Sequence, residues 1–155
     1  MYGNKTILIY DLTNDSELYF EGKDEDVFQG VNLFLQDKNI DLFLDFGGVA
    51  SLFLQNGKEY LQDENIPELK NKNSLIYSFT PKNKWQEEKD DMIRTAKKAG
   101  FKYMILLPQK HGKFGKVWLL ENINIQNITY YEDTAEIIGE LKDKDIKFTI
   151  VQIHN

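Results

Sequence analysis

The stretch 40–53, IDLFLDFGGVASLF, constrains the fold more than any other part of the chain. It begins with an apolar run of strand length, 41–46, which carries Asp45 near its end and is followed by the turn-forming pair Gly47-Gly48. Strands that are apolar on both faces are typical of parallel sheets that helices cover on two sides. The stretch therefore predicts a buried parallel strand with a carboxylate at its carboxyl end.

Further runs of the same character occur along the chain, and helix-like stretches separate them. The other strand-like runs are 6–10, 74–79, 102–107, 128–131 and 146–153, and the helix-like stretches are 24–38, 84–100, 113–122 and 134–144. Repeated alternation of strand and helix predicts crossovers and a parallel sheet. The segment 17–21 (ELYFE) is predicted as a hairpin arm or edge strand, and 51–72 is irregular. We therefore predict an α/β fold with three layers, in which a mostly parallel central sheet has helices on both faces.

Length and composition indicate one cytoplasmic domain. The 155 residues are enough for one domain with one core. Within that domain we distinguish an N-terminal strand and helix (1–39) from the main part of the chain (40–153). With 25 acidic and 19 basic residues the net charge is −6, which disfavours nucleic acid except at a local basic groove. The absence of Cys excludes disulfides, thiolate metal sites and a cysteine nucleophile. No leader and no apolar run of about 20 residues is present, so we expect no membrane partner.

Polar residues follow the predicted strands at the points where those strands end. In open parallel sheets, ligands bind beyond the carboxyl ends of the strands. We therefore expect these residues to gather on one rim. They are Asp45 after the second run, Ser78 and Thr80 at the end of the third, Lys113 and Lys116 after the fourth, and Glu132 and Asp133 after the fifth.

Four segments resemble the motifs of the haloacid dehalogenase (HAD) superfamily of aspartate-nucleophile phosphohydrolases. They are 40–53, then LIYSFT (75–80), HGKFGKVWLLENI (111–123) and ITYYEDTAEIIGELKDKDIKFTIV (128–151). The resemblance covers about residues 40–153, so this part would be a HAD-like core. It is nearest to short, cap-poor members such as the phosphatase half of phage-type polynucleotide kinases. A HAD-like Rossmannoid fold is what the resemblance implies.

The resemblance also implies a mechanism. Asp45 would attack phosphorus and form an aspartyl-phosphate. The hydroxyl of Ser78 or Thr80, and the ammonium of Lys113 or Lys116, would hold the phosphoryl oxygens. Mg²⁺ would be bound by Asp45 and Asp133, with Glu132 as the other member of the acid pair. The substrate would be a small phosphoester or a nucleic-acid end.

A departure from the family pattern and the acidic charge of the chain keep two alternatives open. Gly47 stands where these phosphatases place a second Asp, and general acid–base help of that kind typically contributes roughly 10²–10⁴-fold. The first alternative is therefore a catalytically inactive HAD-like domain that binds a partner protein or ligand. The second is a small acidic inhibitor or immunity-type protein that binds a basic partner.

The nucleophile itself also has an alternative. The segment TILIYDLTND (6–15) offers Asp11 near the N-terminus, with Thr13 in the place of the second Asp. In that case the following helix and the strand IDLFLDF (40–46) would form the first crossover, and Asp45 would stand where a Ser or Thr is expected. We prefer Asp45, because the later motifs then follow in family order. Each candidate also has a structural interpretation, since an Asp before two glycines commonly caps a turn.

Overall fold

The computed structural model describes residues 5–40, 42–45, 74–80, 89–90, 93–94, 96–97, 101–108, 115–125, 128–132, 134–144, 146 and 148–152; for residues 5, 45, 74–80, 108 and 151 it describes the backbone alone. The strands are β1 (Lys5–Asp11), β2 (Ser16–Gly22), β3 (Leu42–Asp45), β4 (Ser74–Thr80), β5 (Tyr103–Pro108), β6 (Thr129–Glu132) and β7 (Thr149–Gln152). The helices are α1 (Asp24–Asp37), α5 (Gly115–Asn122) and α6 (Ala135–Lys142).

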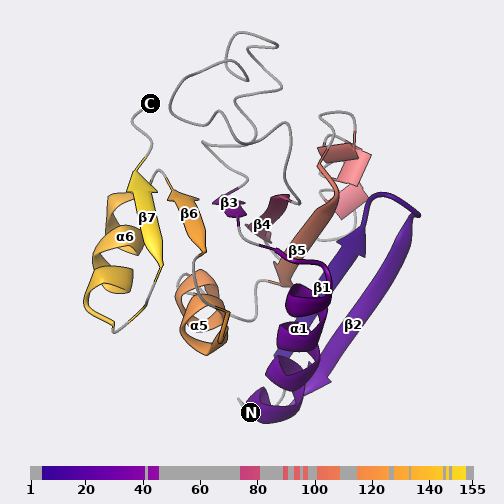
Figure 1. Ribbon diagram of the computed structural model, residues 1–155, viewed down its shortest axis with the longest axis horizontal. Coiled ribbons are helices and arrows are strands. Elements are labelled where there is room, and N and C mark those ends of the chain that lie inside the picture. Colours follow the sequence, from indigo (N-terminus) through magenta and orange to yellow (C-terminus); the bar gives the residue numbers. More distant parts are fainter. Residues whose placement is uncertain are drawn as a thin grey trace, which may run out of the picture.

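All these strands form one sheet in the order β2-β1-β5-β4-β3-β6-β7 (Figure 1). The strands from β5 to β7 in that order are parallel to one another, whereas β1 pairs antiparallel with both β2 and β5. Counted from β3, the parallel strands have the order 3-2-1-4-5, a strand order found in doubly wound α/β sheets. The order reverses direction between β3 and β6, and such a reversal is where ligands bind in open α/β sheets.

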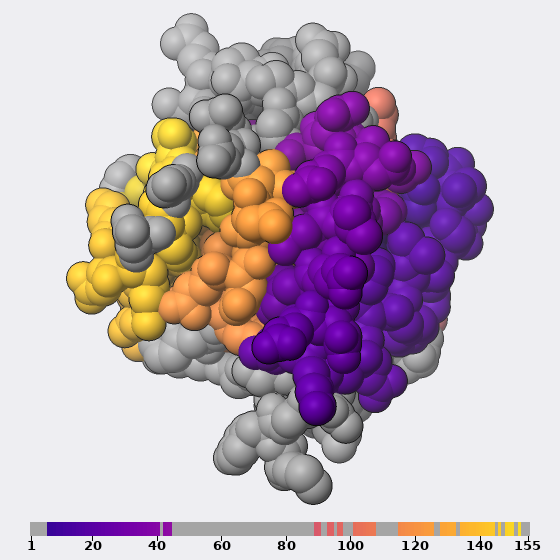
Figure 2. All heavy atoms as spheres, turned by 60° about the horizontal axis from the view of Figure 1, so that its bottom comes forward, coloured from indigo at the N-terminus to yellow at the C-terminus, as the bar shows by residue number. Residues whose placement is uncertain are grey.

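Helix α1 packs one apolar stripe onto the sheet. Val27, Val31 and Leu35 are buried at helical spacing and belong to the same core cluster as Ile7 and Ile9 of β1. Three acidic residues in the first turn of the helix favour its start there, because they complement the helix dipole. In Figure 2, α1 lies on the surface between the β1–β2 hairpin and α5.

The contact between α1 and β2 is close. A Cβ atom added at Gly30 of α1 would lie 2.5 Å from Cδ1 of Phe20 on β2. Phe20 therefore faces α1, so Glu17, three residues earlier on the strand, faces the other side. There the Nζ of Lys89 lies 3.2 Å from Oε1 of Glu17. Helical residues thus contact both faces of the hairpin.

The α/β class is confirmed, and each predicted run coincides with a strand. The segment 17–21 lies in β2, which is an edge strand as predicted. Of the predicted helix 84–100, the structure describes residues 89–90, 93–94 and 96–97, and all of them are helical. The segment 51–72 lies outside the described residues. Within the described chain, no helix has the length and apolar character needed to span a membrane. The HAD-like, three-layer arrangement stays a prediction.

Candidate functional site

The carboxyl ends of β3, β4 and β6 lie side by side. In the β3–β6 pair, Leu44 is in register with Tyr131, so each strand ends one residue later, at Asp45 and Glu132. In the β3–β4 pair, Asp45 is in register with Tyr77, and Ser78 follows it. Neighbouring strands lie about 4.8 Å apart. The sheet thus places the backbones of Asp45, Ser78 and Glu132 near one edge.

Glu132 is a fully buried carboxylate with several donors around it. The Tyr130 hydroxyl donates to Oε2, and the backbone N–H of Thr134 donates to Oε1 at 3.3 Å. Lys116, the second residue of α5, places its Nζ 3.5 Å from the same Oε2. The side chain of Lys116 is only 12% exposed, so this is an ion pair largely withdrawn from water. Lys116 and Glu132, two of the residues expected on one rim, thus lie in contact.

A carboxylate is the ligand type that Mg²⁺ prefers, so the donor chemistry of Glu132 fits this cation. However, both carboxylate oxygens accept hydrogen bonds, and a cation at Oε2 would compete with Lys116 and Tyr130. In the described part of the chain, no three His, Asp or Glu residues are grouped so as to hold a metal ion. Asp133 and the side chain of Asp45 lie outside the described residues. These two stay the predicted metal ligands, whereas Glu132 is the counter-ion of Lys116.

Asp11 lies on a different part of the sheet. It is in register with Tyr103, the first residue of β5, and β5 and β4 separate β1 from β3. Three strand spacings amount to about 14 Å. The alternative motif placement requires β1 and β3 to be consecutive parallel strands, and the antiparallel pairing of β1 contradicts it. Asp11 is therefore not part of the site around Glu132.

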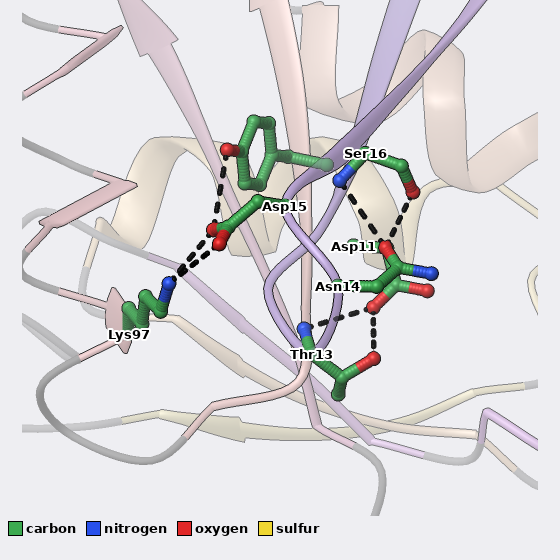
Figure 3. A network of polar contacts seen from close by, with 7 residues as sticks. Asp11, Thr13, Asn14, Asp15, Ser16 and Lys97 are labelled. Atoms are coloured by element: carbon green, nitrogen blue, oxygen red, sulfur yellow. Dashed lines mark hydrogen bonds and ion pairs between the residues drawn. The ribbon is translucent and has the colours of Figure 1, made fainter.

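The hydrogen bonds of Asp11 give it a structural role in the hairpin turn. Its buried carboxylate accepts the backbone N–H of Thr13 at 2.9 Å and the Thr13 hydroxyl at 2.5 Å (Figure 3). An Asp that bonds the chain two residues later stabilises a turn. Asp15, with φ of 57°, completes the reversal of the chain. This turn makes β1 and β2 antiparallel.

The same turn carries an exposed ion pair. Lys97 donates to both carboxylate oxygens of Asp15 at 2.8 Å, and Tyr10 donates to Oδ1 at 3.4 Å (Figure 3). The hydrogen bond from Lys97 lowers the pKa of Asp15, and the same bond raises the pKa of Lys97. Both side chains are about half exposed, and ion pairs of this kind contribute little to stability.

The remaining predicted site residues cannot be placed as side chains. Lys113, Gly47 and Asp133 lie outside the described residues, and Ser78 and Thr80 are described by their backbone. Sequence reasoning missed Tyr130, although its position two residues before Glu132 on a strand places both on one face. No protein-family model, curated protein or solved structure was found to match the chain.

Proposed function

We propose that the chain is a Mg²⁺-dependent phosphohydrolase or phosphotransferase of the HAD type, with Asp45 as the nucleophile. The observation that carries this proposal is the adjacency of β3 and β6, whose carboxyl ends bring Asp45 and Glu132 together. The pair of strands lies at the point where the sheet order reverses, which is the preferred ligand position in such sheets.

The architecture supports the same assignment. A HAD-like fold requires helices on both faces of a mostly parallel sheet. Helix α1 covers one face of the hairpin, and Lys89, a helical residue, contacts Glu17 on the other face. We extend this arrangement to the whole sheet, which gives the three layers of the proposed fold.

The proposed reaction has two steps. The Asp45 carboxylate attacks phosphorus, the bond from phosphorus to the leaving oxygen breaks, and an aspartyl-phosphate forms. Water then attacks this phosphorus and gives up a proton to solvent. The bond from phosphorus to the Asp45 carboxylate oxygen breaks, which releases inorganic phosphate and restores the carboxylate. A hydroxyl of Ser78 or Thr80 and the ammonium of Lys116 hold the phosphoryl oxygens. Asp45 and Asp133 would hold Mg²⁺, which would neutralise further charge on the phosphoryl group.

Gly47 limits which substrates suit this site. With no carboxylate at that position to protonate the leaving oxygen, poor leaving groups lose roughly 10²–10⁴-fold in rate. Leaving groups that depart as stable anions do not need that proton. We therefore propose aryl phosphates or acyl phosphates as the substrates that are turned over best.

The test is hydrolysis of p-nitrophenyl phosphate with and without Mg²⁺, in the wild type and in Asp45→Asn. Asp37→Asn is the matched control, because Asp37 is 76% exposed at the end of α1. We expect Mg²⁺-dependent turnover that Asp45→Asn abolishes and Asp37→Asn preserves. Hydroxylamine should trap the acyl phosphate as a hydroxamate in the peptide that contains Asp45.

Two outcomes would contradict the proposed phosphohydrolase activity or its nucleophile. If Asp45→Asn hydrolyses the substrate as fast as the wild type, Asp45 is not the nucleophile. If the wild type binds inorganic phosphate but hydrolyses nothing, the chain is instead the catalytically inactive binding domain to which Gly47 also points.

A further inference from the structure

We infer that Tyr130 and Glu132 are positioning residues, which together hold the Lys116 ammonium at the carboxyl edge of the sheet as the phosphoryl-binding cation. This inference rests on the proposed function and extends it. It selects Lys116 over Lys113 and gives a role to Tyr130.

The first support is the burial of the network. Tyr130 and Glu132 are fully buried, and Lys116 is nearly so. Tyr130 and Lys116 approach the same oxygen, Oε2 of Glu132. An apolar pair of similar volume is often as stable as a buried ion pair, or more stable. Stability alone is therefore a poor explanation for this pair.

The second support is the rigidity of the anchor. The Tyr130 side chain belongs to the main core cluster, and the residue is in register with Phe43, two residues before Asp45. Its hydroxyl thus ties Glu132 to the core beside the predicted nucleophile. Lysine has a long, flexible side chain that a ligand must order on binding. A lysine already fixed by Glu132 binds a ligand without that cost.

The chemistry of a fixed ammonium defines the class of ligand. Ammonium groups form short, charge-assisted hydrogen bonds with phosphate and carboxylate oxygens. Lys116, the second residue of α5, contacts Glu132, the last residue of β6, so its ammonium lies at the carboxyl end of β6. Asp45 ends the neighbouring strand β3 at the same edge of the sheet. A tetrahedral phosphoryl group bonded to Asp45 is the ligand that suits this position.

The experiment compares two variants with a matched control. Tyr130→Phe removes only the hydroxyl, and the double variant Lys116→Met/Glu132→Gln removes both charges without leaving one unpaired. Tyr10→Phe is the control, because Tyr10 also donates to a carboxylate, that of Asp15 in the hairpin turn. For each we measure kcat and KM for p-nitrophenyl phosphate, the inhibition constant of inorganic phosphate, and urea unfolding.

We expect the double variant to raise KM and the phosphate inhibition constant about 10–100-fold, the effect of one lost charge-assisted bond. Tyr130→Phe should raise both about threefold to tenfold, with a smaller change in kcat, and Tyr10→Phe should change neither. A merely structural network would shift the urea midpoint in both variants and leave the two constants unchanged, which would overturn the inference.

A failure of the proposed function gives a different pattern. If the wild type shows no Asp45-dependent turnover, that proposal fails, and binding of inorganic phosphate by calorimetry then tests the inference separately. Phosphate binding that weakens in Tyr130→Phe and in the double variant, but not in Tyr10→Phe, supports it. No binding by the wild type, or equal binding by all variants, overturns it.

Discussion

Substitution of Gly30 by Ala should lower or raise the free energy of unfolding, depending on whether the ring of Phe20 lies against helix α1. In an isolated helix, Ala is favoured over Gly by about 1 kcal/mol. In α1, the new Cβ would lie 2.5 Å from Cδ1 and 2.6 Å from Cε1 of Phe20. Ordinary carbon contacts are about 3.5–4.0 Å, so the ring must move by roughly 1 Å, and overpacking of this kind costs about 1–3 kcal/mol. The cost of this overlap exceeds the gain in helix propensity, so we expect the free energy of unfolding to fall by about 1 kcal/mol.

The assay is urea or thermal unfolding of a double-mutant cycle. Gly30→Ala should lower the midpoint temperature by about 2–4 °C for a chain of this length. In a Phe20→Ala background the ring is absent, so the same substitution should stabilise the chain by about 1 kcal/mol. If Gly30→Ala stabilises the wild type, the ring does not lie against α1, and the placement of α1 on the hairpin is wrong.

Three further predictions concern the hairpin and helix α1. Asp11→Ala should cost about 2 kcal/mol in urea unfolding, because Thr13 loses its carboxylate acceptor, while the proposed phosphatase activity should stay unchanged. Lys97→Met should raise the pKa of Asp15 towards its ordinary value in an NMR titration. Because Lys97 lowers that pKa, the pair stabilises the fold above the ordinary pKa of aspartate, and the effect is lost as the pH falls through the lowered pKa. Asn32→Ala should cost about 2 kcal/mol in urea unfolding, since its buried amide donates to the carbonyl of Asn122, the last residue of α5, at 3.2 Å and accepts the N–H of Asn124 at 3.1 Å.

Local patterns were sufficient to predict the elements but not their order in the sheet. The run before Asp45 is apolar on both faces because its strand is interior, and the exposed acidic residues of 17–21 match an edge strand. The pairing of β1 with β5 joins residues that are almost a hundred positions apart, and no local pattern encodes such a contact. For that reason the sequence left the choice between Asp11 and Asp45 open, and the strand order removes Asp11.

The candidate site, too, could be predicted from the sequence only in part. The order of strand ends predicted that a lysine of 113–116 and the acid pair at 132–133 would gather on one rim, because parallel strands share a carboxyl edge. It did not separate Lys113 from Lys116, since both lie in one Gly-rich stretch. Tyr130 was assigned to the apolar run of its strand, and its hydroxyl became significant only once Glu132 was known to be buried beside it.

The position of Lys116 within its helix is unfavourable by itself. It lies in the first turn of α5, where the helix dipole favours anionic side chains, and a cation there typically costs about 0.3–1 kcal/mol. No acidic residue is present in that turn to offset it. The negative charge of Glu132 therefore offsets both the ammonium charge of Lys116 and the positive end of the α5 dipole. A phosphoryl group arriving at this edge would meet both positive groups, so the features that make Lys116 a poor stabilising residue make it a suitable anion-binding one.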